Sequence, residues 1–105
     1  DDVLVAPLIG TIDAERAERF MEQLLSAAQS SRARVVFLDV TGVAVVDTQV
    51  AQAIVQSAHA LKLLGSRTVL VGIRPEIAQT LVSLGADLSS LSTAATLQQG
   101  LRMAG

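Results

Sequence analysis

The sequence predicts a single α/β domain of successive βα units, with a mainly parallel sheet and about four helices. Short runs rich in β-branched residues alternate with longer stretches whose apolar residues recur at helical spacing. The chain has 105 residues, which suffices for one hydrophobic core but not for two. Only Phe20 and Phe37 are aromatic, so the core must consist of Leu, Val, Ile and Ala side chains.

The first half of the chain reads as strand, helix, strand. Residues 3–9 form the expected first strand, and Asp13 is placed to cap the helix that follows. The apolar face of this helix would contain Ala17, Phe20, Met21, Leu24, Leu25 and Ala28. Residues 30–32 would end the helix, and residues 35–38 form a continuous apolar run typical of a strand buried on both faces.

The second half begins with a turn at Thr41 and Gly42, followed by a helix that starts after Asp47 and ends at Gly65. Its buried face would contain Ala51, Ile54, Val55, Ala58 and Leu61. Residues 68–71 are the expected third strand. Pro75 is suited to the first position of a short helix that ends at Gly85.

The C-terminal part is less regular. The inward face of the short helix that starts at Pro75 would contain Ile77, Ala78, Leu81 and Val82. Residues 88–91 leave room for a very short strand, and a last helix is expected over residues 93–103, with Ala94, Leu97 and Leu101 on one face.

Composition makes several functions poor candidates. The formal net charge is −2 and no basic run occurs, which disfavours nucleic acid and anionic membranes as partners. Cysteine, tryptophan and tyrosine are absent, so thiolate metal sites are impossible and stacking sites for flat cofactors are disfavoured. No apolar run approaches the length of a membrane span, so we expect a cytoplasmic location. The abrupt start at Asp1 indicates a piece of a longer protein.

Thr48 is the most informative candidate site. If Asp47 caps the second helix, the Thr48 hydroxyl lies on its first turn, where backbone N–H groups are unpaired and the helix dipole is positive. A phosphate there would be tolerated by the helix, yet it would add nearly two negative charges beside Asp47 and repel a docked partner. From these residues alone, an ordinary pair of N-terminal capping residues is the favoured explanation of the same pattern.

Four segments resemble STAS domains, the family of sulphate-transporter tails and anti-sigma-factor antagonists. They are residues 7–13 (PLIGTID), 39–43 (DVTGV), 46–48 (VDT) and 71–81 (VGIRPEIAQTL). The resemblance covers essentially the whole chain and is greatest to the C-terminal domain of RsbR-type stressosome proteins. The last segment is the most specific to that subgroup.

The resemblance implies a phosphorylation-switched interaction module and not an enzyme. Thr48 would accept phosphate from a serine/threonine switch kinase, and no cofactor or metal would be needed. The surface that binds other STAS proteins and the kinase would include Gly42, Val43, Asp47, Thr48 and Gln49. The output would be regulation of an anti-sigma and sigma-factor pathway in stress signalling, within a homodimer or larger assembly.

Two departures from the subgroup limit the comparison. A second phosphorylatable threonine is common just inside the first helix, and Ala14 stands at that position here. Thr11 lies three residues earlier, in the expected turn, and does not replace it. The usual leading edge strand and the N-terminal sensory domain do not precede residues 3–9, so sensing is not assigned to this chain.

Two alternatives remain, and a third is excluded. A cytoplasmic STAS tail of an anion transporter would share the fold, and a small flavodoxin-like domain would bind a ligand. Asp39 at a strand end also resembles the phospho-acceptor of a receiver domain, but the acidic pair and the late lysine of receivers are missing, so we expect Asp39 to bond the turn. His59 stands alone on a helix, and Gly10 and Thr11 form no phosphate loop.

Overall fold

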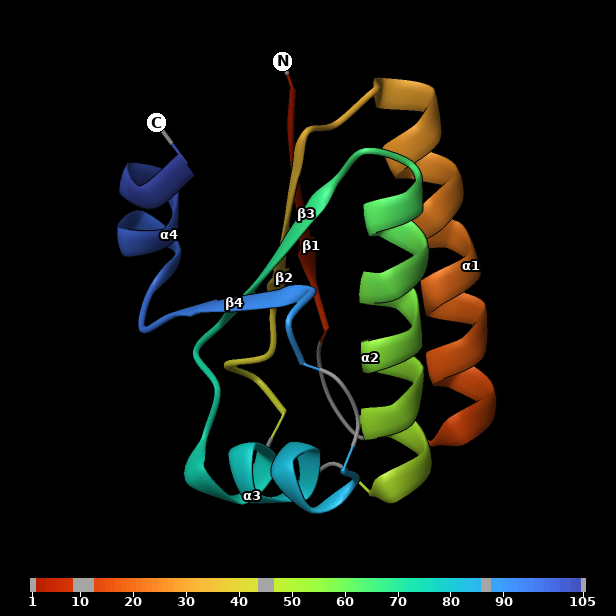
Figure 1. The fold of residues 1–105 in the computed structure, drawn as a ribbon, viewed down its shortest axis with the longest axis vertical. Helices are drawn as coiled ribbons and strands as arrows, with labels where there is room; N and C mark the ends of the chain where they lie inside the picture. Colours follow the sequence, from red (N-terminus) through yellow and green to blue (C-terminus); the bar gives the residue numbers. More distant parts are fainter. Residues whose placement is uncertain (1, 9–12, 44–46, 86–87, 105) are drawn as a thin grey trace.

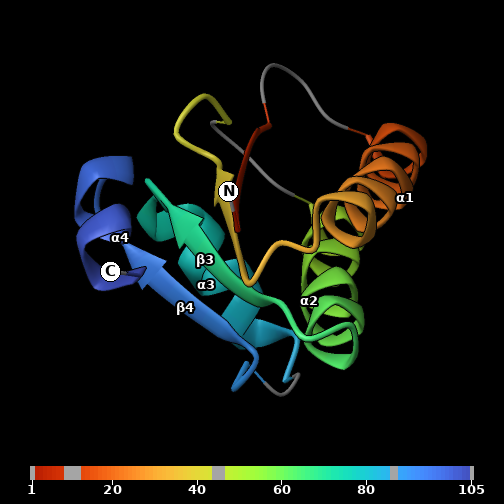
Figure 2. The same ribbon diagram turned by 90° about the horizontal axis from the view of Figure 1, so that it is seen from above.

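The chain folds around a parallel sheet with helices on both faces. The computed structural model describes residues 2–8, 13–43, 47–85 and 88–104. Four strands lie in the order β1-β2-β3-β4, with bounds Val3–Pro7, Val35–Asp39, Arg67–Val71 and Leu91–Ala94. Helices α1 (Ala14–Ser31) and α2 (Thr48–Leu63) cover one face, and α4 (Leu97–Ala104) covers the other (Figures 1 and 2). The predicted α/β fold with a parallel sheet is confirmed.

Strand β2 is the centre of the core. Its residues Val35 to Leu38 are all buried because β1 and β3 flank it and helices lie on both faces. Val36 and Leu38 face the larger apolar cluster beneath α1 and α2, whereas Val35 and Phe37 belong to the smaller cluster beneath α4. The predicted doubly buried strand is therefore confirmed.

The two long helices begin and end where the sequence predicts. Helix α1 starts at the Asp13 cap, whose carboxylate accepts a hydrogen bond from the Arg16 N–H at 2.8 Å. Helix α2 ends in a Schellman motif, in which Gly65 has a φ of 89°. There the Gly65 N–H donates to the Lys62 carbonyl at 3.0 Å and the Ser66 N–H to the Leu61 carbonyl at 2.8 Å. All five residues predicted on the buried face of α2 are buried.

The region after residue 88 differs from the prediction. The strand is Leu91–Ala94, not residues 88–91, and the last helix begins at Leu97, not at residue 93. The Thr96 hydroxyl accepts from the Gln99 N–H at 3.1 Å, while Gln99 Oε1 accepts from the Ala95 N–H at 2.7 Å. These reciprocal bonds start the helix later, in the manner of a capping box.

Three side-chain predictions were also wrong. Val82 of α3 (Pro75–Ser83) was expected to face inward and is 70% exposed; Leu101 of α4, expected on one apolar face with Ala94 and Leu97, is 45% exposed. Ala94 is buried, but as the end of β4 and not on a helix. Strand β1 ends at Pro7, and Ile9, where we placed its end, lies outside the described residues.

Candidate functional site

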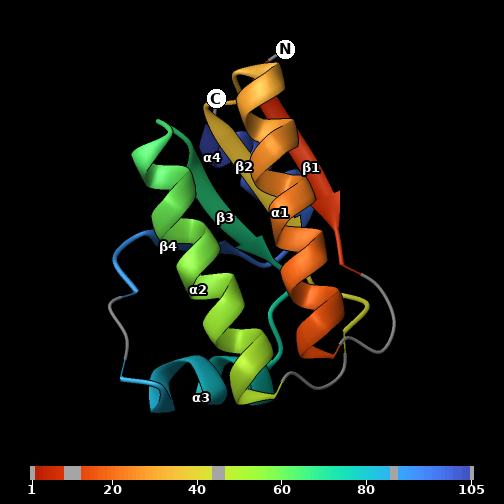
Figure 3. The same cartoon turned by 90° about the vertical axis from the view of Figure 1, so that its right-hand side faces the viewer.

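The candidate site lies at the end of the sheet where the parallel strands finish. Helix α3 lies across this end, and the first turn of α2 is beside it (Figures 1 and 3). The chain leaves β2 through the turn at Thr41 and Gly42 and leaves β3 through Gly72. The start of α2 and the loops after two neighbouring strands thus form one surface.

Asp47 and Thr48 have the positions predicted for them. Asp47 is the N-cap of α2, and its Oδ1 accepts a hydrogen bond from the Val50 N–H at 2.8 Å. Thr48 and Gln49 are the first two residues of the helix, and both are exposed. Val50 is fully buried, so this cap fixes the start of α2 against the core. Thr48 is therefore an exposed residue at a capped helix start.

The turn after β2 is held by Asp39, as expected. Its carboxylate accepts from the Thr41 N–H at 2.9 Å, and the Val43 N–H donates to the Val40 carbonyl at 3.0 Å. Gly42 is exposed, whereas the Val43 side chain is only 1% exposed and belongs to the core. Of the five residues predicted to bind partners, Val43 is the one that is buried as a whole and presents almost no surface to a partner.

Two residues of the segment 71–81, for which no contact with this turn was predicted, hold the turn against the loop after β3. Gly72 has a φ of 72°, and a Cβ at this position would lie 2.0 Å from Thr41 Oγ1. Arg74 Nη2 donates to the Thr41 carbonyl at 3.4 Å. The glycine directly after an apolar strand was the available signal for the close approach, but the Arg74 contact joins residues 33 positions apart and has no local signature.

The other candidate residues are separate from this surface. Ala14 is half-buried on the first turn of α1, and Thr11 and Val46 lie outside the described residues. His59 lies midway along α2 and is half-buried. Within the described ranges no group of three His, Asp or Glu side chains could hold a metal ion. In the same part of the chain, no helix combines the length and the apolar character needed to cross a membrane.

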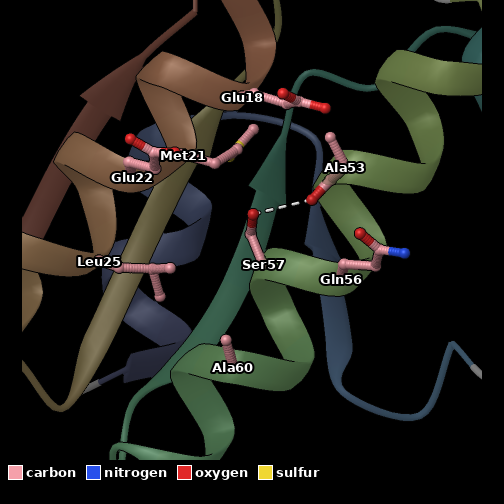
Figure 4. A pocket seen from close by; sticks show the side chains of 8 residues that line it. All are labelled: Glu18, Met21, Glu22, Leu25, Ala53, Gln56, Ser57 and Ala60. Carbon is pink, nitrogen blue, oxygen red and sulfur yellow. Dashed lines mark hydrogen bonds between the residues drawn. The ribbon is translucent and has the colours of Figure 1, made fainter. Parts of the chain in front are cut away.

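A groove of about 340 Å³ between α1 and α2 offers no alternative catalytic centre among its lining residues (Figure 4). Glu18 and Glu22 line it from α1, and both are exposed. The hydroxyl of Ser57 on α2 donates to the Ala53 carbonyl at 2.7 Å, so it is bonded within its own helix. The one hydroxyl of this lining is thus bonded to a carbonyl and to neither carboxylate, so the lining contains no nucleophile paired with a base.

Taken together, the parallel sheet, the capped and exposed start of α2 and the loops packed beside it define a small α/β domain with an exposed helix start at one end of its sheet. A STAS domain family model matches residues 1–100, and the chain belongs to this family. Its sequence is similar to RsbR-type co-antagonist proteins of Bacillus subtilis, which confirms the subgroup resemblance.

Two curated relatives match nearly the whole of this chain in sequence. The chain is 53% identical over 104 residues to "RsbT co-antagonist protein RsbRA" and 43% identical over 101 residues to RsbRD, both from Bacillus subtilis. These matches cover 99% and 96% of this chain but only 38% and 36% of the relatives. The chain therefore spans well under half the length of the curated relatives it matches.

Two solved structures have the same fold. A variant of RsbS from Moorella thermoacetica superposes with a TM-score of 0.85 at 33% identity, covering 98% of this chain and 87% of that one. A chain from a structure of the stressosome, described as a signal integration and transduction hub, superposes with a TM-score of 0.84 at 32% identity. That match covers 98% of this chain and 90% of the other.

Proposed function

We propose that this domain is a phosphorylation-switched interaction module of a stressosome-type assembly. It binds other STAS proteins and a serine/threonine switch kinase, and through them it regulates an anti-sigma and sigma-factor pathway. Thr48 is the phospho-acceptor. The similarity to RsbR-type co-antagonists and to a stressosome chain supports the assembly, and the exposed Thr48 on a capped helix start supports the switch.

The local electrostatics of α2 suit a phosphate at Thr48. The first turn of α2 contains no acidic residue, so Asp47 is the only carboxylate at this helix start within the described residues. Unpaired N–H groups and the positive end of the helix dipole stabilise an anion at this point. A phosphate therefore leaves the fold intact while it changes the charge of the exposed surface.

The switch acts on binding because it places charge on the contact surface. Gly42, Asp47, Thr48 and Gln49 are exposed, and a partner covering them would have to desolvate a phosphate beside the Asp47 carboxylate. That desolvation and repulsion weaken a partner whose own surface is neutral or acidic there, and favour one that offers cations. The kinase supplies the chemistry, and this chain supplies the acceptor and the surface.

The test is binding to an RsbS-type STAS protein before and after phosphorylation. We expect sedimentation velocity to show a complex whose affinity changes at least fivefold when Thr48 carries phosphate. Thr48→Ser should retain the switch, whereas Thr48→Ala should bind with unmodified affinity and not respond to the kinase. Absence of any complex in all forms, or an equal affinity with and without phosphate, would contradict the proposal.

A further inference from the structure

A cationic cavity lies at the opposite end of α2 from Thr48. Its volume is about 370 Å³, and its lining includes Lys62 and Gly65 from the end of α2 and the segment after it. Because an α-helix rises about 1.5 Å per residue, roughly 20 Å of helix separates this cavity from Thr48. The cavity is therefore distinct from the surface described above.

Three cations from three separate segments meet at this cavity. Arg34 precedes β2, Lys62 lies in the last turn of α2, and Arg67 begins β3. None of the described lining residues is acidic. Arg34 forms an exposed ion pair with Asp2 and lowers the pKa of that carboxyl through its hydrogen bond. Lys62 and Arg67 form no ion pair with any residue in the described ranges.

The helix dipole explains only one of these cations. Lys62 lies at the negative end of α2, where a positive charge is stabilising. Arg34 and Arg67 precede strands, which have small dipoles, so nothing in their own elements favours a positive charge. Lys62 and Arg67 have no counter-charge among the described residues, so they repel each other, and a bound anion removes that repulsion.

Hydroxyl donors complete the lining. Ser89 and Ser90 line the cavity from the segment before β4 and Ser92 lines it from β4 itself; Ser90 and Ser92 are half-buried. Ser66 is buried, and its hydroxyl donates to the Ala33 carbonyl at 2.6 Å. The Arg67 N–H donates to the Arg34 carbonyl at 2.7 Å. These bonds fix the backbone that carries two of the three cations.

We propose that this cavity binds a phosphate dianion, either as inorganic phosphate or as a phosphate monoester. Guanidinium groups match the oxygens of phosphate in a bidentate manner, an ammonium adds a compact charge, and serine hydroxyls donate to the remaining oxygens. Arg67 and Lys62 supply the main charge, because Arg34 already has Asp2 as a partner. A carboxylate, with one charge and two oxygens, would satisfy fewer of these donors.

Two sources could supply this phosphate. One is a small phosphate compound, and the other is phosphothreonine at position 48 of a second copy of the chain. The second source rests on the proposed function, whereas the anion site itself does not. The two ends of α2 are complementary in charge, since Asp47 and the Thr48 phosphate lie at its start and Lys62 and Arg67 lie at or near its end.

The experiment is a titration of the ¹⁵N-labelled chain with potassium phosphate, followed by amide chemical shifts and compared with potassium chloride at equal ionic strength. We expect saturable shifts at Ser66, Arg67, Ser90 and Ser92 with phosphate only. Combining Lys62→Ala with Arg67→Ala should weaken the apparent affinity at least tenfold. Arg102→Ala removes a basic residue of α4 outside this cavity and should leave the affinity unchanged.

Three outcomes would contradict the proposed phosphate site. They are equal shifts with chloride, shifts that never saturate, or a loss of affinity in Arg102→Ala as large as that in the double variant. A second arm adds unlabelled chain phosphorylated at Thr48. Shifts in the same residues would identify the second copy as the source, while a response to inorganic phosphate alone would identify a small compound. If Thr48 proves not to be a phospho-acceptor, the phosphate titration still decides the anion site.

Discussion

The Asp47 carboxylate accepts a hydrogen bond from the Val50 N–H at 2.8 Å, and this bond joins an exposed helix cap to the backbone of a fully buried residue. It fixes where α2 begins and therefore where the Thr48 hydroxyl lies. Replacing Asp47 by Ala removes the cap and should lower the free energy of unfolding by about 1 kcal/mol.

Matched variants separate the cap from its neighbour. Asp47→Asn keeps a capping oxygen and should retain most of the stability. Thr48→Ala changes an exposed hydroxyl outside the cap and should alter the unfolding free energy by less than about 0.5 kcal/mol. Urea unfolding followed by circular dichroism measures all three. An equal loss in Asp47→Ala and Thr48→Ala would contradict the cap geometry.

The approach of Gly72 to Thr41 predicts a large effect from a single methyl group. In Gly72→Ala the new Cβ would overlap Thr41 Oγ1, and the left-handed φ of 72° adds strain of about 1 to 2 kcal/mol. Gly65 has a φ of 89° but open space around it, so Gly65→Ala should show the strain alone. Chemical denaturation should rank Gly72→Ala as clearly less stable than Gly65→Ala. The reverse order would refute the packing of these two loops.

Helix α4 packs on the sheet through Gly100. A Cβ there would lie 2.7 Å from Cε1 of Phe37, which is fully buried. Gly100→Ala gains helix propensity of about 1 kcal/mol but overpacks the smaller core, and we expect a net loss of stability. Phe37→Leu should remove that penalty in the double variant. A double-mutant cycle with no coupling between the two sites would show that α4 is placed differently.

Strand β1 has an unpaired edge in the sheet described here. The Leu8 N–H donates to the Asp39 carbonyl at 2.8 Å, so alternate residues Leu4 and Ala6 also direct their backbone groups to β2. Val3, Val5 and Pro7 direct theirs outward, and the Val5 side chain is 43% exposed. For a protein of residues 1–105 we expect dimers or larger species at high concentration.

Light scattering coupled to gel filtration measures this association. Val5→Lys places a charge beside the edge and should shift the protein toward the monomer. A monomeric mass that stays constant over a wide concentration range in the unmodified chain would contradict the expectation.

Because Ala14 has no hydroxyl, we expect the kinase to add one phosphate to this chain and not two. Ala14 is the first residue of α1 and follows the Asp13 cap, so it has a position equivalent to that of Thr48 on α2, but it has no hydroxyl. An Ala14→Thr variant should gain a second phosphate under the same conditions. Intact mass measures the difference. A second phosphate on the unmodified chain, or none gained by the variant, would show that the residue correspondence is wrong.

Local sequence signals were sufficient to predict most of the helices and strands, including the start of α2. Asp13, Asp47 and Pro75 each mark a helix start within a few residues, so these boundaries could be read without tertiary information. The segment 91–94 could not, because Leu-Ser-Thr-Ala has little strand character and becomes β4 only by pairing with β3. The Thr96 and Gln99 spacing was a readable capping signal that the sequence argument missed.

The candidate site was predictable only in part. The exposure of Thr48 and its cap follow from sequence-adjacent residues. The burial of Val43 and the contact of Arg74 with the Thr41 carbonyl depend on how the two loops pack. The cationic cavity has the same origin, since Arg34, Lys62 and Arg67 meet only because strands β2 and β3 are neighbours.

The most direct test of the central claim is to locate the phosphate after treatment with the cognate switch kinase and ATP. Peptide mass spectrometry should place the phosphate on Thr48, and Thr48→Ala should remain unmodified while keeping its melting temperature. Phosphate on Ser57, Thr80 or Thr96 with none on Thr48 would contradict the account.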